Sequence, residues 1–205
     1  MTKDKASTIW VAIGFSIAFM CIWTLSHELS ASREERFPLY FEWESNIRFQ
    51  WWAMPIYFSL DLAVTLFPLW FKNWKEALAP MLTLLTQTLI AAPLFIFIPI
   101  GVGYENALDG GIWGHTLFNP IGAKNISLWN HAPSLHVAYV FTISFIISNK
   151  KSAAYKCAFY FWAILVSVST MLVHEHHLIC VTGGFILFAV TIPTIYPTLE
   201  RKFAT

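Results

Sequence analysis

The chain contains few charged residues and few cysteines. Only 12% of its 205 residues are charged and the formal net charge is +1, so electrostatics gives no reason to expect a nucleic-acid partner. The three cysteines, Cys21, Cys157 and Cys180, lie in or beside apolar runs and show no paired spacing. This pattern argues against a disulfide framework and against a zinc site. Internal repeats and low-complexity tracts are also lacking, which argues against a repeat protein.

Hydrophobic residues are abundant instead. They make up 57% of the chain, aromatic residues make up 17%, and the mean hydropathy is +0.56. This balance is typical of an integral membrane protein, in which roughly 20 apolar residues cross ~30 Å of hydrocarbon. The apolar runs lack the alternating pattern of barrel strands, so we expect helices. The sequence predicts an all-α integral membrane bundle, a single domain with six transmembrane helices, at 9–26, 51–70, 78–102, 132–148, 157–173 and 178–196.

Basic residues are distributed unequally between the connections of these helices. If the N-terminus is inside, the inner connections carry nine Lys and Arg residues and the outer ones carry four. Since basic residues are retained in the cytoplasm, both termini are expected there. The segments 27–50, 103–131 and 174–177 are then expected on the outer face. The first of these mixes charged and aromatic residues, and we expect an interfacial helix or lid.

Two polar clusters interrupt the apolar pattern on that outer side. In "APSLH", Pro133 fits the first turn of the fourth helix, and Ser134 and His136 stand at the same helix end. The free N–H groups and the dipole of a helix N-terminus favour an anion. The turn "HEHH" at 174–177 joins the fifth and sixth helices on the same side. Two histidine-bearing segments are therefore predicted to face one compartment.

These clusters resemble two motifs of the type 2 phosphatidic acid phosphatase superfamily, the lipid phosphate phosphatases. "APSLH" (Ala132–His136) looks like the second motif, Pro-Ser-Gly/Leu-His. "STMLVHEHHLICVTGG" (Ser169–Gly184) looks like the third, in which Ser-Arg/Thr is followed after five residues by a histidine, here His176. The stretch from Tyr40 to Val64 resembles the entry to the second helix in bacterial members akin to inositolphosphotransferases. The similarity covers roughly residues 37–185.

The resemblance implies phosphoryl transfer through a covalent phosphohistidine. His176 would attack phosphorus, His136 would protonate the leaving oxygen, and Ser134 with nearby N–H groups would hold the phosphoryl oxygens. The implied substrate is a lipid phosphate or a polyprenyl diphosphate in the bilayer. The implied location is the inner (plasma) membrane of a bacterium, with the site on the outer face. We expect no metal and no cofactor, and nothing in the sequence predicts an oligomeric state.

The chain departs from the family at two charged positions. Asn106 stands where the first motif has arginine, and Cys180 stands where the third motif has aspartate. Asparagine cannot imitate the two-pronged phosphate contact of arginine. A neutral thiol is a poor partner for the nucleophilic imidazole, so Cys180→Asp is expected to raise a weak activity.

Other residues are candidates for the missing roles. Lys124 and His131 in the outer loop would supply positive charge to a substrate phosphate, and Asn106 remains a candidate phosphate ligand. Glu105 or Glu175 would orient a histidine. However, a carboxylate next to His176 in sequence would point elsewhere if both residues were helical.

Plainer interpretations stand beside these. Ser134 also fits a helix cap, and His177 and His174 fit interfacial or supporting positions rather than catalysis. Asp61 lies inside an apolar run, so it must face protein or water and is expected to pair with a hydroxyl or a histidine without being catalytic.

Three classes of function remain open on the sequence. The first is a membrane lipid phosphatase or phosphotransferase. The second is a catalytically impaired relative that binds lipid or a partner, which the residues at 106 and 180 favour. The third is a metal-dependent membrane enzyme, which the sequence favours least because "HEHH" lacks the spacing that sets several imidazoles on one helix face.

Overall fold

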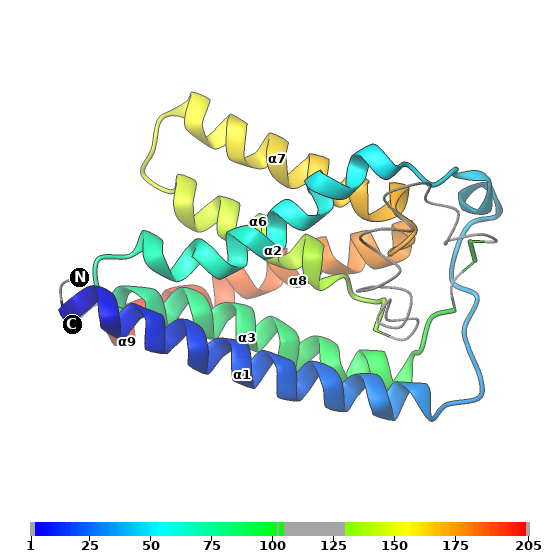
Figure 1. Ribbon diagram of the computed structural model, residues 1–205, viewed down its shortest axis with the longest axis horizontal. Helices are drawn as coiled ribbons and strands as arrows, with labels where there is room; N and C mark the ends of the chain where they lie inside the picture. The colour runs from blue at the N-terminus through cyan, green and yellow to red at the C-terminus, as the bar shows by residue number, and fades with distance from the viewer. Residues whose placement is uncertain (1–2, 102, 105–129, 204–205) are drawn as a thin grey trace.

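The computed structural model describes residues 3–101, 103–104 and 130–203 of the chain. This part is helical and contains no strand, only an isolated bridge between Phe37 and Ile100, so the all-α prediction is confirmed for it. Asn106 and Lys124 lie outside the described residues. The α-helices are α1 (Lys3–Ala31), α2 (Met54–Leu66), α3 (Trp74–Phe97), α6 (Leu135–Ser148), α7 (Ala153–Leu172), α8 (Leu178–Thr194) and α9 (Tyr196–Phe203) (Figure 1). Short 3-10 helices are η1 (Glu42–Asn46), η2 (Trp51–Ala53) and η3 (Phe67–Trp70).

Helix α6 is the centre of the bundle. It packs against α7 and α8 and also touches α2 and α3, while α1 lies along α3 (Figure 1). Most of its side chains are buried. A polar bridge ties three helices together, because the Gln87 Nε2 donates to Thr142 Oγ1 at 2.7 Å and to Thr191 Oγ1 at 2.8 Å. Such hydrogen bonds between helices are favourable in an apolar interior, where an unpaired amide is costly.

The beginnings of α6 and α8 approach each other closely at glycine. A Cβ atom on Gly184 would overlap the carbonyl oxygen of Ser134 and press on Val137, and a Cβ on Gly183 would lie 3.2 Å from Pro133. The Ser134 N–H also donates to the Cys180 carbonyl at 2.9 Å. This contact sets the first turn of α6 beside the turn that precedes α8, and so it sets one histidine segment beside the other.

Four stretches are long and apolar enough to cross a bilayer: Ala6–Ala31, Trp51–Trp70, Trp74–Phe97 and Ala153–Leu172. The pair α8 and α9, bent by 42°, would make a fifth. Helix α6 has only 14 residues, about 21 Å at the α-helical rise, and is shorter than the hydrocarbon core. The six expected spans are therefore not all confirmed.

Several expected boundaries differ from the observed ones. The expected helix at 132–148 begins at Leu135, because the Ser134 side chain accepts the Val137 N–H and caps the helix. The expected helix at 78–102 ends at Phe97, because Ile98 precedes a proline and such a residue disfavours helical backbone. The segment 27–50 contains the last turn of α1 and then the short η1, and not a continuous interfacial helix.

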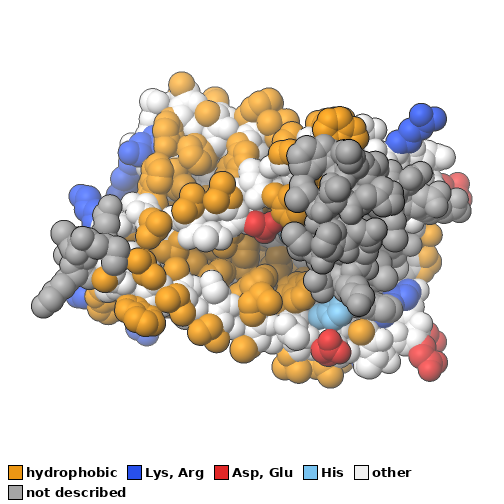
Figure 2. Space-filling model, in the orientation of Figure 1, with side chains coloured by type: hydrophobic (Ala, Val, Ile, Leu, Met, Phe, Trp, Pro, Cys, Tyr) orange, Lys and Arg blue, Asp and Glu red, His pale blue; other side chains and the backbone are white. Residues whose placement is uncertain are grey.

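The two ends of the bundle differ in chemistry. Figure 1 places the beginning of α1 and the end of α9 at the same end, which also carries the turn between α6 and α7 with Lys150 and Lys151. Figure 2 shows Lys and Arg side chains at this end, a broad apolar surface over the middle of the molecule, and both basic and acidic side chains at the opposite end. The histidine-bearing segments lie at the opposite end (Figure 1).

Candidate functional site

The turn at 173–177 carries four titratable residues at the end of α7. The carbonyl of Thr170 accepts the N–H groups of both Glu175, at 3.0 Å, and His176, at 3.1 Å. His174 adopts the left-handed conformation, with φ of 61°. Its Nε2 lies 2.8 Å from the Ile47 carbonyl oxygen, so Nε2 must carry the proton and donate it. These bonds reverse the chain tightly within five residues.

Three imidazoles meet at one cavity. The ring centroid of His176 lies 5.9 Å from that of His136 and 6.0 Å from that of His131. All three line a cavity of about 150 Å³, together with Phe19, Trp23, Tyr57, Phe95, Asn130, Leu135 and Glu175. The second and third motifs thus converge here although His136 and His176 are far apart in sequence, as the motif pattern predicts.

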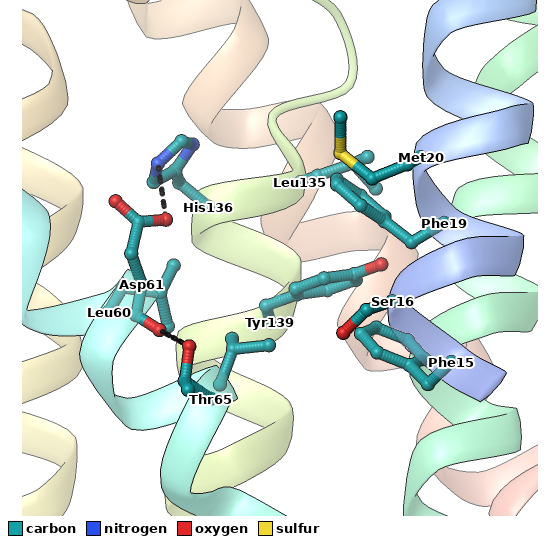
Figure 3. A pocket seen from close by; sticks show the side chains of 11 residues that line it. Phe15, Ser16, Phe19, Met20, Leu60, Asp61, Thr65, Leu135, His136 and Tyr139 are labelled. Atoms are coloured by element: carbon teal, nitrogen blue, oxygen red, sulfur yellow. Dashed lines mark hydrogen bonds and ion pairs between the residues drawn. The ribbon is translucent and has the colours of Figure 1, made fainter. Parts of the chain in front are cut away.

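Helix α2 brings two further residues to His136. The Tyr57 ring stacks on the His136 ring at 4.4 Å between centroids. One helical turn later on the same face, Asp61 Oδ1 lies 4.0 Å from His136 Nε2, and Figure 3 shows the carboxylate pointing toward the ring. This distance exceeds hydrogen-bond range, and the pair is ionic only when His136 is protonated. Asp61 therefore faces a histidine, as expected for an acidic residue in an apolar helix.

His176 is a buried imidazole at the cavity. Its side chain belongs to a residue only 6% exposed, and Nδ1 has no hydrogen-bond partner among the described residues. Burial, with smaller contributions from the charges of His136 and His131, lowers the pKa of His176 well below its ordinary value. The ring is therefore neutral near pH 7, and a nitrogen lone pair is available for nucleophilic attack.

Glu175 also lines the cavity, so the condition under which it was expected to point away from His176 is not met. That expectation assumed a helix, whereas residues 173–177 form a turn, so neighbouring side chains are not forced apart. Burial and, to a smaller extent, the negative charge of Asp61 raise the pKa of Glu175 to about 7. This carboxyl group can hold or release a proton near neutral pH.

The other candidate residues of the two motifs do not line the cavity. Ser134 and Cys180 are both fully buried, and neither is among the residues that line the cavity. The Ser134 hydroxyl caps α6, and the hydroxyls of Ser169 and Thr170 bond back to carbonyls of α7. No Lys or Arg lines the cavity within the described part of the chain.

His177 lies outside the cavity and has a carboxylate partner that sequence reasoning missed. Its Nδ1 is 2.7 Å from Glu44 Oε2, in a pair that is almost wholly buried. Glu44 belongs to η1, in the stretch "FEWES", where two acidic residues flank a tryptophan. Nothing in that pattern separates the buried Glu44 from the exposed Glu42, so the sequence offered no usable signal.

A second cavity adjoins the first. It has a volume of about 220 Å³, shares Phe19, Leu135 and His136 with the first, and lies between α1 and α2 over α6 (Figure 3). Its lining is mostly apolar, with Asp61, Ser16 and Thr65 as polar members. His136 therefore stands at the junction of a polar and an apolar space.

No family model, curated protein or solved structure matches the chain. Within residues 3–101, 103–104 and 130–203, no group of three or more His, Cys, Asp or Glu side chains is arranged to hold a metal ion.

Proposed function

We propose that the protein is a membrane lipid phosphatase or phosphotransferase of the type 2 phosphatidic acid phosphatase kind, acting through a phosphohistidine. One observation carries the proposal. His136 and His176, which the two motifs assign as acid and nucleophile, lie with ring centroids 5.9 Å apart at one cavity. An acid and a nucleophile that act on one phosphorus atom must both be held within reach of it.

The proposed reaction has two steps. In the first, a ring nitrogen of His176 forms a bond to phosphorus, the bond to the leaving oxygen breaks, and His136 gives that oxygen a proton. In the second, water or another alcohol attacks the phosphohistidine, its proton passes to His136, and the N–P bond breaks. The neutral state of the buried His176 supports its part as nucleophile.

The adjoining apolar cavity supports a lipid substrate. The phosphate ester would lie beside His136, which lines both cavities, and the hydrocarbon chain would extend between α1 and α2. A hydrocarbon chain placed there contacts apolar side chains instead of water, which is favourable. The proposed substrates are therefore a lipid phosphate or a polyprenyl diphosphate.

The proposed topology follows from the basic residues. The end of the bundle with the basic turn between α6 and α7 would be cytoplasmic, with both termini there. The histidine cavity would then face the outside of a bacterial inner membrane. Helix α6 would be a short central crossing that other helices surround, which would complete six crossings.

A second candidate function is that of a catalytically impaired relative that binds lipid. Two observations favour it: His176 Nδ1 has no partner among the described residues, and no Lys or Arg of that part lines the cavity. An unoriented nucleophile and a weakly positive site would both slow phosphoryl transfer.

Trapping the covalent intermediate separates these two functions. Purified protein would be incubated with phosphatidic acid, diacylglycerol diphosphate or a polyprenyl diphosphate, each labelled in the transferred phosphate, and quenched in base to preserve phosphohistidine. We expect label on the wild type, none on His176→Ala, and slower labelling of His136→Ala. His27→Ala on α1 is the control, because His27 does not line the cavity and meets it only through its stack on Trp23, so labelling should remain close to that of the wild type.

Two results would contradict the proposal. Label that persists in His176→Ala would place the nucleophile elsewhere. Absence of label and of released phosphate with all three substrates would favour the impaired relative.

A further inference from the structure

Glu44 is an acidic residue that is fully buried, where an unpaired charge costs folding free energy. It is 0% exposed, although Glu42 in the same 3-10 helix is exposed. Its Oε1 accepts the Phe41 N–H at 3.1 Å, and its Oε2 accepts the Leu178 N–H at 3.1 Å and faces His177 Nδ1 at 2.7 Å. A buried carboxylate is stable only when its oxygens are satisfied in this way. Glu44 therefore ties η1 to the first turn of α8.

The hydrogen bonds of His177 fix its tautomer. The Gly103 N–H donates to Nε2 at 3.1 Å, so Nε2 is an acceptor and the proton of a neutral ring must be on Nδ1. That proton is donated to Glu44. Tyr40 and Tyr104 stack on the ring, with centroids at 4.9 Å and 4.4 Å. The imidazole is thus held by two hydrogen bonds and two aromatic rings.

The same cluster reaches the backbone of His176. The Tyr104 hydroxyl donates to the His176 carbonyl at 2.9 Å, and its ring also stacks on His174 at 4.2 Å. The His176 N–H is already bonded to Thr170 at 3.1 Å. Both polar backbone groups of His176 therefore have fixed partners. The partner of the carbonyl, Tyr104, stacks on the His177 ring, and His177 is hydrogen-bonded to Glu44.

We propose that Glu44 is a positioning residue: it fixes the 173–177 turn through His177 and Tyr104, and so fixes the direction of the His176 imidazole in the cavity. The inference rests on the proposed function. It gives the site a carboxylate from η1, whereas this chain has Cys180 where the motif has aspartate, and this carboxylate acts on the neighbouring histidine instead of the nucleophile. Misplacement of a reacting group by about 1 Å can cost on the order of 10²-fold in rate, so such support matters.

The test compares two glutamates of η1. Glu44→Gln removes the charge but keeps the size, and Glu42→Gln makes the same change on the exposed side of η1. We expect Glu44→Gln to lower kcat for phosphate release by roughly 10- to 100-fold with KM within about twofold, because supporting residues act on orientation more than on binding. Glu42→Gln should match the wild type.

Two further variants separate positioning from damage to the fold. His177→Phe keeps the stacking with Tyr40 and Tyr104 but loses both ring hydrogen bonds. If Glu44 acts through His177, the double variant Glu44→Gln/His177→Phe should lose no more kcat than the worse single variant. Tyr104→Phe removes only the hydroxyl bond to His176 and should lower kcat by a smaller factor, roughly threefold to tenfold. It keeps the inference testable even if Glu44→Gln does not fold.

A spectroscopic signature makes the outcome independent of turnover. In protein labelled with ¹⁵N histidine, we expect a downfield Nδ1–H resonance that vanishes in His177→Phe and moves upfield in Glu44→Gln, because a bond to a neutral amide is weaker. Equal kcat in Glu44→Gln and Glu42→Gln, with an active wild type, would overturn the inference and leave the proposed function intact. An inactive wild type without phosphohistidine would remove the proposed function and the positioning role together, whereas the resonance would still report the bond between Glu44 and His177.

Discussion

Replacing Cys180 by aspartate is expected to harm this protein, although the motif alone predicts a gain. Cys180 is fully buried in the first turn of α8, and the Glu44 carboxylate acts electrostatically on it. An aspartate at this position would bring a second carboxylate toward one that already holds His177. Like charges in a buried site disfavour each other, so one of the two would have to be protonated or hydrated.

The loss of stability in Cys180→Asp can be estimated for two cases, a charged and a protonated aspartate. An uncompensated buried charge costs about 3–5 kcal/mol. Keeping an ordinary aspartate protonated at pH 7 costs about 4 kcal/mol, since its pKa of about 3.9 must rise by about 3 units at 1.36 kcal/mol each. Both routes give about 3–5 kcal/mol, which for a chain of this size corresponds to a fall in Tm of roughly 6–20 °C.

Thermal unfolding in detergent measures this loss, and phosphate release measures the consequence for turnover. Cys180→Ala is the neutral control, with an expected cost of about 1 kcal/mol. The double variant Glu44→Gln/Cys180→Asp should recover at least 1 kcal/mol relative to the sum of the two single changes, because it leaves one carboxylate in place of two. A Cys180→Asp variant that keeps the wild-type Tm and releases phosphate faster would refute this account of the carboxylates.

Three further predictions concern charge, packing and topology. Because burial raises the pKa of Glu175 to about 7, its carboxyl is neutral below that pH and negative above it; KM for a lipid phosphate should therefore rise above pH 7 in the wild type and stay level in Glu175→Gln. Gly184→Ala should lower Tm by several degrees, because its Cβ would overlap the Ser134 carbonyl oxygen and push α8 away from α6. Single cysteines at Ser45 and Lys151, in a variant free of native cysteines, should react with an impermeant reagent from opposite sides of the membrane, the first from outside; labelling from one side would contradict the topology.

The motifs predicted the centre of the site because each is anchored to a helix end. "APSLH" sets His136 in the first turn of α6 through the Ser134 cap, and the turn after α7 carries His176. The contact of α6 and α8 at Gly184 then brings these two ends together. Local signals of capping and helix termination are readable in a sequence, so the meeting of the two imidazoles was predictable.

The partners of the histidines were not readable in the same way. Glu44 is 133 residues from His177 in sequence, and it differs from Glu42 only in the side of a short 3-10 helix on which it lies. The direction of the Glu175 side chain depends on the left-handed backbone conformation of His174. The sequence has no glycine at this position to indicate that conformation. Long-range pairing and turn geometry depend on tertiary packing, and a motif does not encode them.

The distribution of carboxylates bears on whether the cavity can hold a phosphate. Glu44 is paired with His177, and its charge is balanced by hydrogen bonds outside the cavity. Asp61 and Glu175 line the two adjoining cavities, so a bound phosphate would meet negative charge. This repulsion is reduced if Glu175 is protonated, or if positive charge on the imidazoles outweighs the carboxylate charge. The raised pKa of Glu175 supplies the first condition near neutral pH. Under the proposed function, Cys180 would not by itself prevent turnover, and phosphate binding would depend on the protonation of Glu175 beside His176.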